Sequence, residues 1–153
     1  MQKLPISISG FPELRKKNCV YVDKTKHIYS LLTSNCRSFL ARPRRFGKSL
    51  LVTTLEAALQ GKKELFDGLF IASSDYSWEP KGVIRLDFSQ LSIKNAETFE
   101  QDLFVMLTII AGKYNIKIKD GLSVNAALSI IITELCLEKE GKKDFDSVAI
   151  LID

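Results

Sequence analysis

The most informative residues of this chain form one short cationic segment, Arg42-Pro43-Arg44-Arg45-Phe46-Gly47-Lys48-Ser49. A Gly-Lys-Ser ending at the start of a helix is typical of phosphate-binding loops, where free backbone N–H groups and the helix dipole favour an anion. In such a loop the glycine lets the backbone approach the phosphates. Lys48 would reach the β- and γ-phosphate oxygens, and the Ser49 hydroxyl would ligate Mg²⁺. We therefore expect residues 42–49 to bind a Mg-nucleotide.

The first position of this loop departs from the usual GxxxxGK[ST] pattern, because Arg42 stands where that pattern has glycine. An arginine cannot adopt every backbone conformation that is open to glycine, so the start of the loop must differ. A basic surface turn ahead of a helix is the alternative interpretation. Arg44 and Arg45 are compatible with both interpretations. In a phosphate-binding loop they would contact the phosphates or a neighbouring subunit's nucleotide, and in a basic surface turn they would lie in solvent.

A second candidate segment closes the chain, where the apolar run Val148–Ile152 is followed by Asp153. A buried strand that ends on an acidic residue has the form of a Walker B segment, whose aspartate holds Mg²⁺ directly or through water. The alternative is a terminal carboxylate on a buried strand. Taken together with Lys48, the pattern favours a metal site made by Ser49 and Asp153.

The loop needs a strand before it and a helix after it, and the chain offers a candidate for each. Alternating strands and helices predict an α/β fold with a mostly parallel sheet and flanking helices. Residues 1–22 are predicted to form an extended arm, with turns at its prolines and glycine. The predicted strands are Cys36–Ala41, Val83–Phe88 and Val148–Ile152, and the predicted helices are Lys24–Thr33, Lys48–Gln60 and two that follow the caps Asn95 and Ser123.

Local signals mark several of these boundaries. Asp23 is predicted to be a helix N-cap, and Gly61 is predicted to end the helix after the loop. That helix is predicted to bury the face of Leu51, Leu55, Ala58 and Leu59. Asp87, at the end of the second strand, is expected to cap a local turn and not to bind a ligand.

Composition excludes several other classes of protein. The 153 residues suit one domain, and no apolar run approaches the length of a membrane span. The N-terminus lacks the apolar core of a signal peptide, so a cytoplasmic location is expected. Cys19, Cys36 and Cys136 form no CxxC pair, which argues against a disulfide framework and a structural zinc site. His27 is the only histidine in the sequence and is expected on a helix surface.

The positive charge is concentrated in the loop. The chain carries 22 basic and 18 acidic residues, and without the four cations of residues 42–48 the two classes are equal. A local excess suits a compact anion better than a long polyanion. A nucleic-acid-binding module that uses Arg42, Arg44 and Arg45 is the alternative, but the neutral remainder of the chain and the lack of interleaved aromatic residues weigh against it.

Four stretches of the sequence together resemble the AAA-ATPase-like family of prokaryotic proteins: YVDKT (21–25), RPRRFGKSL (42–50), LFDGLFI (65–71) and AILID (149–153). The similarity runs from Leu4 to Asp153, and in that family Arg42 is the normal residue. The resemblance implies one P-loop ATPase domain of the AAA and STAND type over residues 1–153, with ATP and Mg²⁺ as ligands. It also implies a nucleic-acid partner through a separate C-terminal domain, since members often carry a nuclease-like domain of the PD-(D/E)xK kind.

The family pattern continues beyond the point where this sequence stops. After LID the family has Glu-Tyr-Asp, and that glutamate would polarise the attacking water. We therefore expect a fold that is incomplete at the C-terminus, because the strand between the loop strand and the Walker B strand would come later. Residues 1–153 alone are expected to be poorly soluble or loosely packed and to show no ATP turnover above background. An inactive gene remnant is the further alternative.

Overall fold

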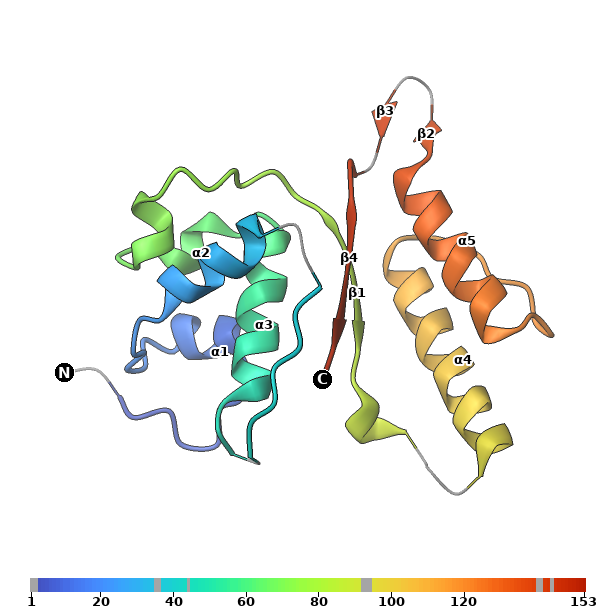
Figure 1. Cartoon of the computed structure of the whole chain (residues 1–153), viewed down its shortest axis with the longest axis horizontal. Coiled ribbons are helices and arrows are strands. Elements are labelled where there is room, and N and C mark those ends of the chain that lie inside the picture. The colour runs from blue at the N-terminus through green and yellow to red at the C-terminus, as the bar shows by residue number, and fades with distance from the viewer. Residues whose placement is uncertain (1–2, 35–36, 44, 92–94, 140–141, 144) are drawn as a thin grey trace. The chain divides into compact units, whose positions relative to one another are not determined.

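The computed structural model describes residues 3–34, 37–43, 45–91, 95–139, 142–143 and 145–153. The chain divides into two compact units, Met1–Pro80 and Lys81–Asp153. Each unit has its own hydrophobic core, and Figure 1 shows the elements of both in chain order. Helices and strands occur together and two strands pair in parallel, so the predicted α/β class is confirmed.

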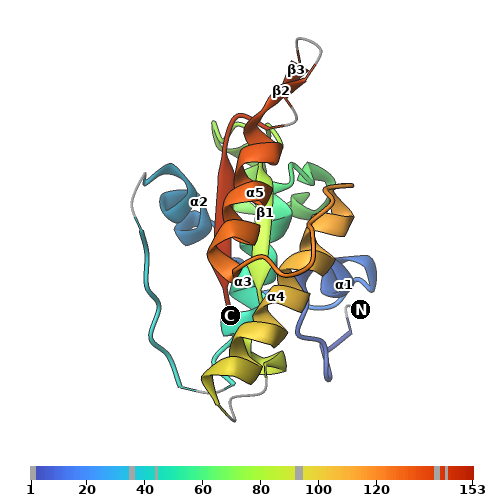
Figure 2. The same cartoon turned by 90° about the vertical axis from the view of Figure 1, so that its right-hand side faces the viewer.

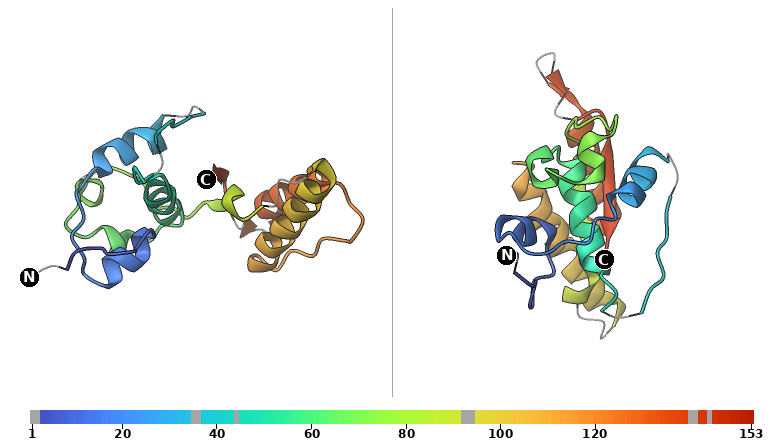
Figure 3. Two further views of the ribbon diagram at one scale, coloured as in Figure 1. Left: turned by 90° about the horizontal axis from the view of Figure 1, so that it is seen from below. Right: turned by 90° about the vertical axis from the view of Figure 1, so that its left-hand side faces the viewer.

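The first unit is helical. Its elements are α1 (Phe11–Lys16), α2 (Thr25–Thr33), α3 (Lys48–Leu59) and the two 3₁₀ turns η1 (Lys63–Phe66) and η2 (Phe70–Ser73). Figure 3 shows these elements from two directions. They pack around fully buried Phe66, whose ring centroid lies 4.7 Å from that of Phe11 and 5.1 Å from that of Trp78. The guanidinium of Arg15 adds a polar link, since its Nε donates to the carbonyl of Leu65 at 2.8 Å.

The predicted extended arm is wrong for residues 11–16, which form α1. Pro12 stands in the first turn of this helix, where a proline has no N–H to lose and its fixed φ suits a helix. Phe11 and Leu14 are buried, so packing stabilises a helix that is too short to be stable alone. Nearer the N-terminus, Lys3 and Cys19 form a parallel bridge.

The predicted strand Cys36–Ala41 is also wrong for its described part. Cys36 lies outside the described residues, and residues 37–41 have neither helix nor strand and are exposed. Phe39 is 93% exposed and Leu40 is 41% exposed. A strand needs a neighbour to satisfy its backbone groups, and in the described part of the chain no strand pairs with this segment.

The second unit contains the strands and the two long helices. Its elements are β1 (Gly82–Leu86), η3 (Phe88–Gln90), α4 (Ala96–Lys113), α5 (Val124–Cys136), β2 (Glu138–Lys139), β3 (Lys142–Lys143) and β4 (Val148–Ile152). β1 and β4 pair in parallel with Ile84 opposite Ile150, and β2 and β3 form a short antiparallel pair. Figure 2 shows β1 and β4 running side by side. The predicted strand 148–152 is confirmed. The predicted strand 83–88 is also present, but the observed strand ends two residues before the predicted end, at Leu86.

Helices α4 and α5 cover the face of β1 that carries Ile84 and Leu86. Both helices begin as predicted, because the Asn95 side chain accepts from the N–H of Thr98 and the Ser123 hydroxyl accepts from the N–H of Ala126. Their predicted apolar faces meet in the core, where Leu107, Ile110, Ala127, Ile131 and Leu135 are buried. The second unit is therefore a parallel strand pair with two helices on one face.

Tyr114 closes one edge of β1. Its hydroxyl donates to the carbonyl of Val83 at 2.9 Å and accepts from the N–H of Val83 at 3.0 Å. The neighbouring Gly82 donates toward the β4 side, to the carbonyl of Ser147. Because successive residues of a strand point their backbone groups to opposite edges, Tyr114 satisfies the edge of β1 that faces away from β4.

Among the described residues, no helix is both long and apolar enough to span a membrane.

Candidate functional site

The cationic loop ends in a sharp backbone turn at the start of α3. Gly47 is the N-cap of this helix and has φ of 73°, and Arg45 also has a positive φ, 68°. Side chains other than glycine rarely adopt this left-handed region. Lys48 is the first residue of α3, and the predicted helix Lys48–Gln60 is confirmed with its end at Leu59. Gly61 follows with φ of 71°, as expected for a residue that stops a helix.

The loop presents its polar groups to solvent. Arg42, Arg45 and Lys48 are exposed, Ser49 is half-buried, and Arg44 lies outside the described residues. The first helical hydrogen bond of α3 runs from the N–H of Leu51 to the carbonyl of Gly47. The amides ahead of it therefore have no partner within the helix and face the loop. Cations and free N–H groups at one exposed helix start can together hold a polyanion.

Two buried threonines fix the first turns of α3 against α1. The Thr53 hydroxyl accepts from the N–H of Phe11 at 3.0 Å and donates to the carbonyl of Ser49 at 2.9 Å. The Thr54 hydroxyl donates to the carbonyl of Leu50 at 2.7 Å. Sequence reasoning missed both residues, because the predicted buried face was drawn through leucines. Their bonds hold the backbone of Ser49 and Leu50 in place beneath the loop.

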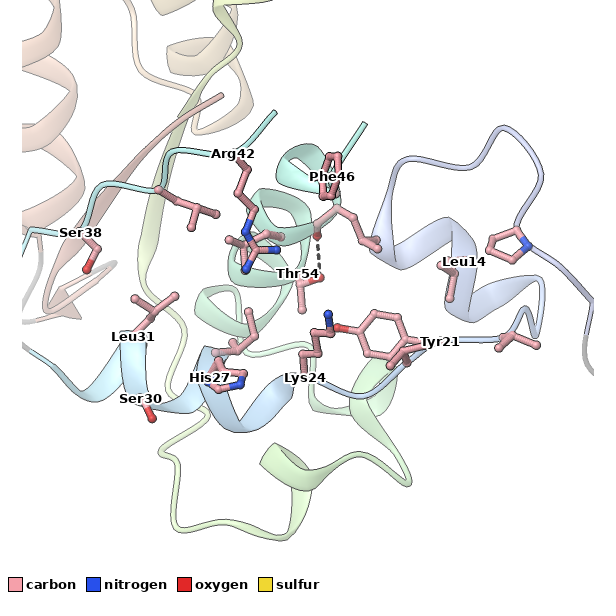
Figure 4. Close-up of a pocket in the computed structure, with 18 of the residues that line it drawn as sticks. Leu14, Tyr21, Lys24, His27, Ser30, Leu31, Ser38, Arg42, Phe46 and Thr54 are labelled. Atoms are coloured by element: carbon pink, nitrogen blue, oxygen red, sulfur yellow. Dashed lines mark hydrogen bonds between the residues drawn. The ribbon is translucent and has the colours of Figure 1, made fainter. Parts of the chain in front are cut away.

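A cavity of about 830 Å³ opens beside the loop in the first unit. Figure 4 shows its walls, which come from α2, from α3 and from the segments around residues 20–24 and 38–47. Leu31, Leu50 and Leu51 supply apolar wall, while Lys24 and His27 add polar groups. His27 lies exposed on α2, as predicted. No pattern in the sequence indicates this cavity, because its lining residues are spread from Pro5 to Thr54.

Tyr21 and Arg42 approach the cavity from opposite sides. Tyr21 belongs to the segment before α2, and its ring packs edge-on against Phe11 with centroids 5.2 Å apart. Burial raises the pKa of the Tyr21 phenol, and a hydrogen bond with Thr54 acts in the opposite direction. Burial is the larger of the two effects, so the pKa of the phenol lies above its usual value. Arg42 contributes a positive charge, and in Figure 4 its guanidinium points into the cavity.

Asp153 lies in the second unit, directly after β4. Its N–H donates to the carbonyl of Leu86 and its own carbonyl accepts from the N–H of Phe88, both at 2.9 Å. Asp87 follows the neighbouring strand, and its Oδ1 accepts from the N–H and the hydroxyl of Ser89, so its predicted turn-capping role is confirmed. Asp87 and Asp153 thus both lie at the carboxyl end of the parallel pair formed by β1 and β4. The shared metal site of Ser49 and Asp153 stays a prediction, because the two residues belong to different units.

Comparison with known proteins decides the family. A family model described as predicted AAA-ATPase matches residues 5–153. The chain belongs to this AAA-ATPase-like family. The chain is also 37% identical over 110 residues to an uncharacterised protein in the vnfD 5' region of Azotobacter chroococcum mcd 1. That match covers 71% of this chain but 21% of the relative's length, so this chain spans a minor part of that protein. No solved structure matches the chain.

In this member of the AAA-ATPase-like family, the YVDKT stretch has a structural use. Oδ1 of Asp23 accepts from the N–H and the hydroxyl of Thr25 at 2.8 and 2.7 Å, and Oδ2 accepts from the N–H of Phe70 at 2.7 Å. Burial acts to raise the pKa of the Asp23 carboxyl, but these hydrogen bonds and the charge of Arg15 bring it below its usual value. The expectation that Asp23 is the N-cap of a helix from Lys24 is wrong, because Lys24 holds the N-cap position and α2 begins at Thr25. The Asp23 carboxylate still accepts from the first N–H of that helix.

Proposed function

We propose that this chain binds ATP with Mg²⁺ through residues 42–49, as a P-loop of the AAA and STAND type. The observation that carries the proposal is the position of Lys48. It is the first residue of a twelve-residue helix and directly follows a glycine in the left-handed conformation. Its ammonium group and the free amides of α3 therefore belong to the same exposed helix start, where both can bind an anion. Membership of a family of predicted AAA-ATPases supports ATP as the nucleotide.

Each loop residue has a physical role in this proposal. Gly47 carries no side chain toward the ligand, and a Cβ at this position would meet no atom within 4 Å, so the space above the turn is open to phosphate. Lys48 neutralises the terminal phosphates, and Arg45 adds charge from the same turn. The half-buried Ser49 hydroxyl is the protein ligand to Mg²⁺ in this proposal. The bound metal would screen the charge of the phosphates.

The proposed activity is binding, and its test is the substitution Lys48→Ala. Loss of one charge-assisted hydrogen bond costs ~1.5–3 kcal/mol, which corresponds to about 10–150-fold weaker ATP binding. Lys62→Ala is the matched control, because Lys62 is exposed just beyond the opposite end of the same helix. Calorimetric titration with Mg-ATP should separate the two variants. Equal affinity of the wild type and Lys48→Ala would refute the proposal, and phosphate release measured alongside tests turnover separately.

A second candidate function, binding of single-stranded nucleic acid, gains one observation from the structure. Contrary to the expected lack of interleaved aromatic residues, Phe39 and Phe46 flank the cations Arg42 and Arg45 in one segment, and they are 93% and 63% exposed. Exposed aromatic rings beside basic residues are the platform on which unpaired bases stack. Binding of an oligonucleotide that weakens steeply with salt and is lost in Phe39→Ala, together with no binding of ATP, would favour this candidate.

A further inference from the structure

The hydroxyl of Thr53 joins helix α1 to the first turn of α3. Its oxygen accepts from the N–H of Phe11 at 3.0 Å, and the carbonyls of Ser49 and Leu50 lie within reach of its proton at 2.9 and 3.0 Å. Thr53 is 8% exposed, so little water can replace these partners. A threonine on a helix often donates to the carbonyl four residues before it. Here the same oxygen also receives a donor from 42 residues away, so the bond links two helices.

The amide of Phe11 depends on this link. Phe11 is the first residue of α1, and no side chain at the N-cap Gly10 accepts a hydrogen bond. The first N–H groups of a helix have no partner within that helix. Thr53 supplies an acceptor from a different helix instead. Because a buried donor without a partner costs free energy, the Phe11 amide favours the observed position of the Thr53 hydroxyl.

Helix α1 is held firmly enough to act as the anchor of this link. Its side chains Phe11 and Leu14 are 0% and 2% exposed. Toward its other end, Arg15 donates from Nε to the carbonyl of Leu65 at 2.8 Å and from Nη2 to the carbonyl of Asp67 at 2.6 Å. The position of the Phe11 amide is therefore set by the core of the first unit and not by the cationic loop.

We propose that Thr53 is a positioning residue, through which α1 sets the place of Ser49 for Mg²⁺. This inference rests on the proposed function and deepens it, because it assigns the accuracy of the metal ligand to a buried residue one turn further along α3. Mg²⁺ demands near-ideal ligand geometry at ~2.0–2.1 Å. The long, flexible side chain of Lys48 can instead follow a displaced phosphate. A small shift of the Ser49 backbone should therefore impair metal-assisted binding and spare metal-free binding.

The test measures the gain in ATP affinity that Mg²⁺ brings, as the ratio of the affinities in Mg²⁺ and in EDTA. Thr53→Val has nearly the same shape without the hydroxyl, and it should remove most of this gain. Loss of a group that orients a metal ligand usually costs ~10–100-fold in metal affinity. Thr53→Ser keeps the hydroxyl and should retain most of the gain. Thr108→Val is the matched control, because its exposed hydroxyl also donates to a carbonyl four residues back, that of Phe104, but on α4.

A measurement on the unmodified chain tests the same link, and it applies even if Thr53→Val fails to fold. A metal that restrains Ser49 should also restrain the Phe11 amide through the hydroxyl between them, because coupling between two sites acts in both directions. Hydrogen exchange of the Phe11 amide, followed by NMR, should therefore be slower with Mg-ATP than with ATP in EDTA. Exchange of the Ala127 amide, which donates to Ser123 in the second unit, should be the same in both conditions.

The outcomes separate the two proposals. If Lys48→Ala leaves the ATP affinity unchanged both in Mg²⁺ and in EDTA, the proposed function fails. If Lys48→Ala weakens binding but Thr53→Val keeps the wild-type gain, the phosphate site stands and the positioning role of Thr53 is overturned. An equal loss of the gain in Thr53→Ser and Thr53→Val would overturn that role too, as would a wild type that gains no affinity from Mg²⁺ or an unchanged exchange rate at Phe11. Far-UV circular dichroism of each variant verifies that its helices are intact.

Discussion

Removing one hydroxyl from Tyr114 should loosen the edge of β1. In Tyr114→Phe the ring remains, and with it the edge-on contact with Phe145 at 5.9 Å between centroids. The hydroxyl disappears, and with it both hydrogen bonds to the backbone of Val83, at 2.9 and 3.0 Å. Since Val83 is only 4% exposed, its N–H and carbonyl have little access to water as a replacement.

The expected cost follows from these two bonds. A neutral hydrogen bond contributes ~0.5–1.5 kcal/mol to stability, so losing both destabilises the second unit by about 1–3 kcal/mol. The same free energy should appear locally, because the amide of Val83 exchanges its hydrogen only when this edge opens. Exchange at Val83 should therefore be about 5–150-fold faster in the variant.

Amide hydrogen exchange followed by NMR measures this effect at Val83 itself, and urea unfolding measures it for the unit as a whole. Tyr29→Phe is the control, because its hydroxyl bonds to the exposed carboxylate of Asp75 in the first unit. That substitution should leave exchange at Val83 unchanged. Exchange at Val83 as slow in Tyr114→Phe as in the wild type would show that the hydroxyl does not protect this edge.

Two further predictions concern the first unit. An L-residue held in the left-handed backbone conformation costs ~1–2 kcal/mol. Gly61→Ala should destabilise the first unit by more than this, because the new Cβ would lie 2.6 Å from the carbonyl oxygen of Trp78. Gly68→Ala, where φ is 77° and the space is open, should cost only the conformational amount. Equal urea midpoints for the two variants would contradict the clash. Asp23→Asn should lower the free energy of unfolding of the first unit by about 1 kcal/mol at neutral pH, because a charged hydrogen-bond acceptor becomes a neutral one. Because the folded pKa of Asp23 lies below its usual value, this stabilisation is present above the ordinary aspartate pKa of ~3.9 and is lost as the pH falls through the folded value. Thermal midpoints of wild type and Asp23→Asn should thus converge in acid, and a constant gap from pH 7 to pH 2 would refute the argument.

The features that could be predicted from the sequence were those set by neighbouring residues. Asn95 and Ser123 cap their helices because a short polar side chain can reach an N–H two or three residues ahead in any context. The run Val148–Ile152 forms a strand because β-branched residues suit a pleated surface. Lys48 begins a helix for the same local reason, as Gly47 supplies the turn that precedes it.

The features that sequence reasoning missed depend on distant parts of the chain. Helix α1 is stable because Phe11 meets Phe66 and donates to Thr53, partners that lie more than forty residues away. The segment 37–41 has strand-like composition, but composition cannot supply a neighbouring strand. The cavity is the clearest case, because its lining residues are spread from Pro5 to Thr54, and no local pattern indicates that they meet.

The hydrogen bonds of Asp23 and Thr25 constrain the number of residues in a distant segment, 65–71. Asp23 accepts from the N–H of Phe70, and the Thr25 hydroxyl accepts from the N–H of Ile71 at 3.1 Å. Both donors are main-chain groups, so the identity of the side chains at 70 and 71 does not matter to these bonds, but the spacing of the backbone does. Single-residue insertions or deletions within 65–71 would detach α2 from η2 even with every residue of YVDKT intact. In a chimera with another member of the family, the stretches 21–25 and 65–71 should therefore be exchanged as a pair.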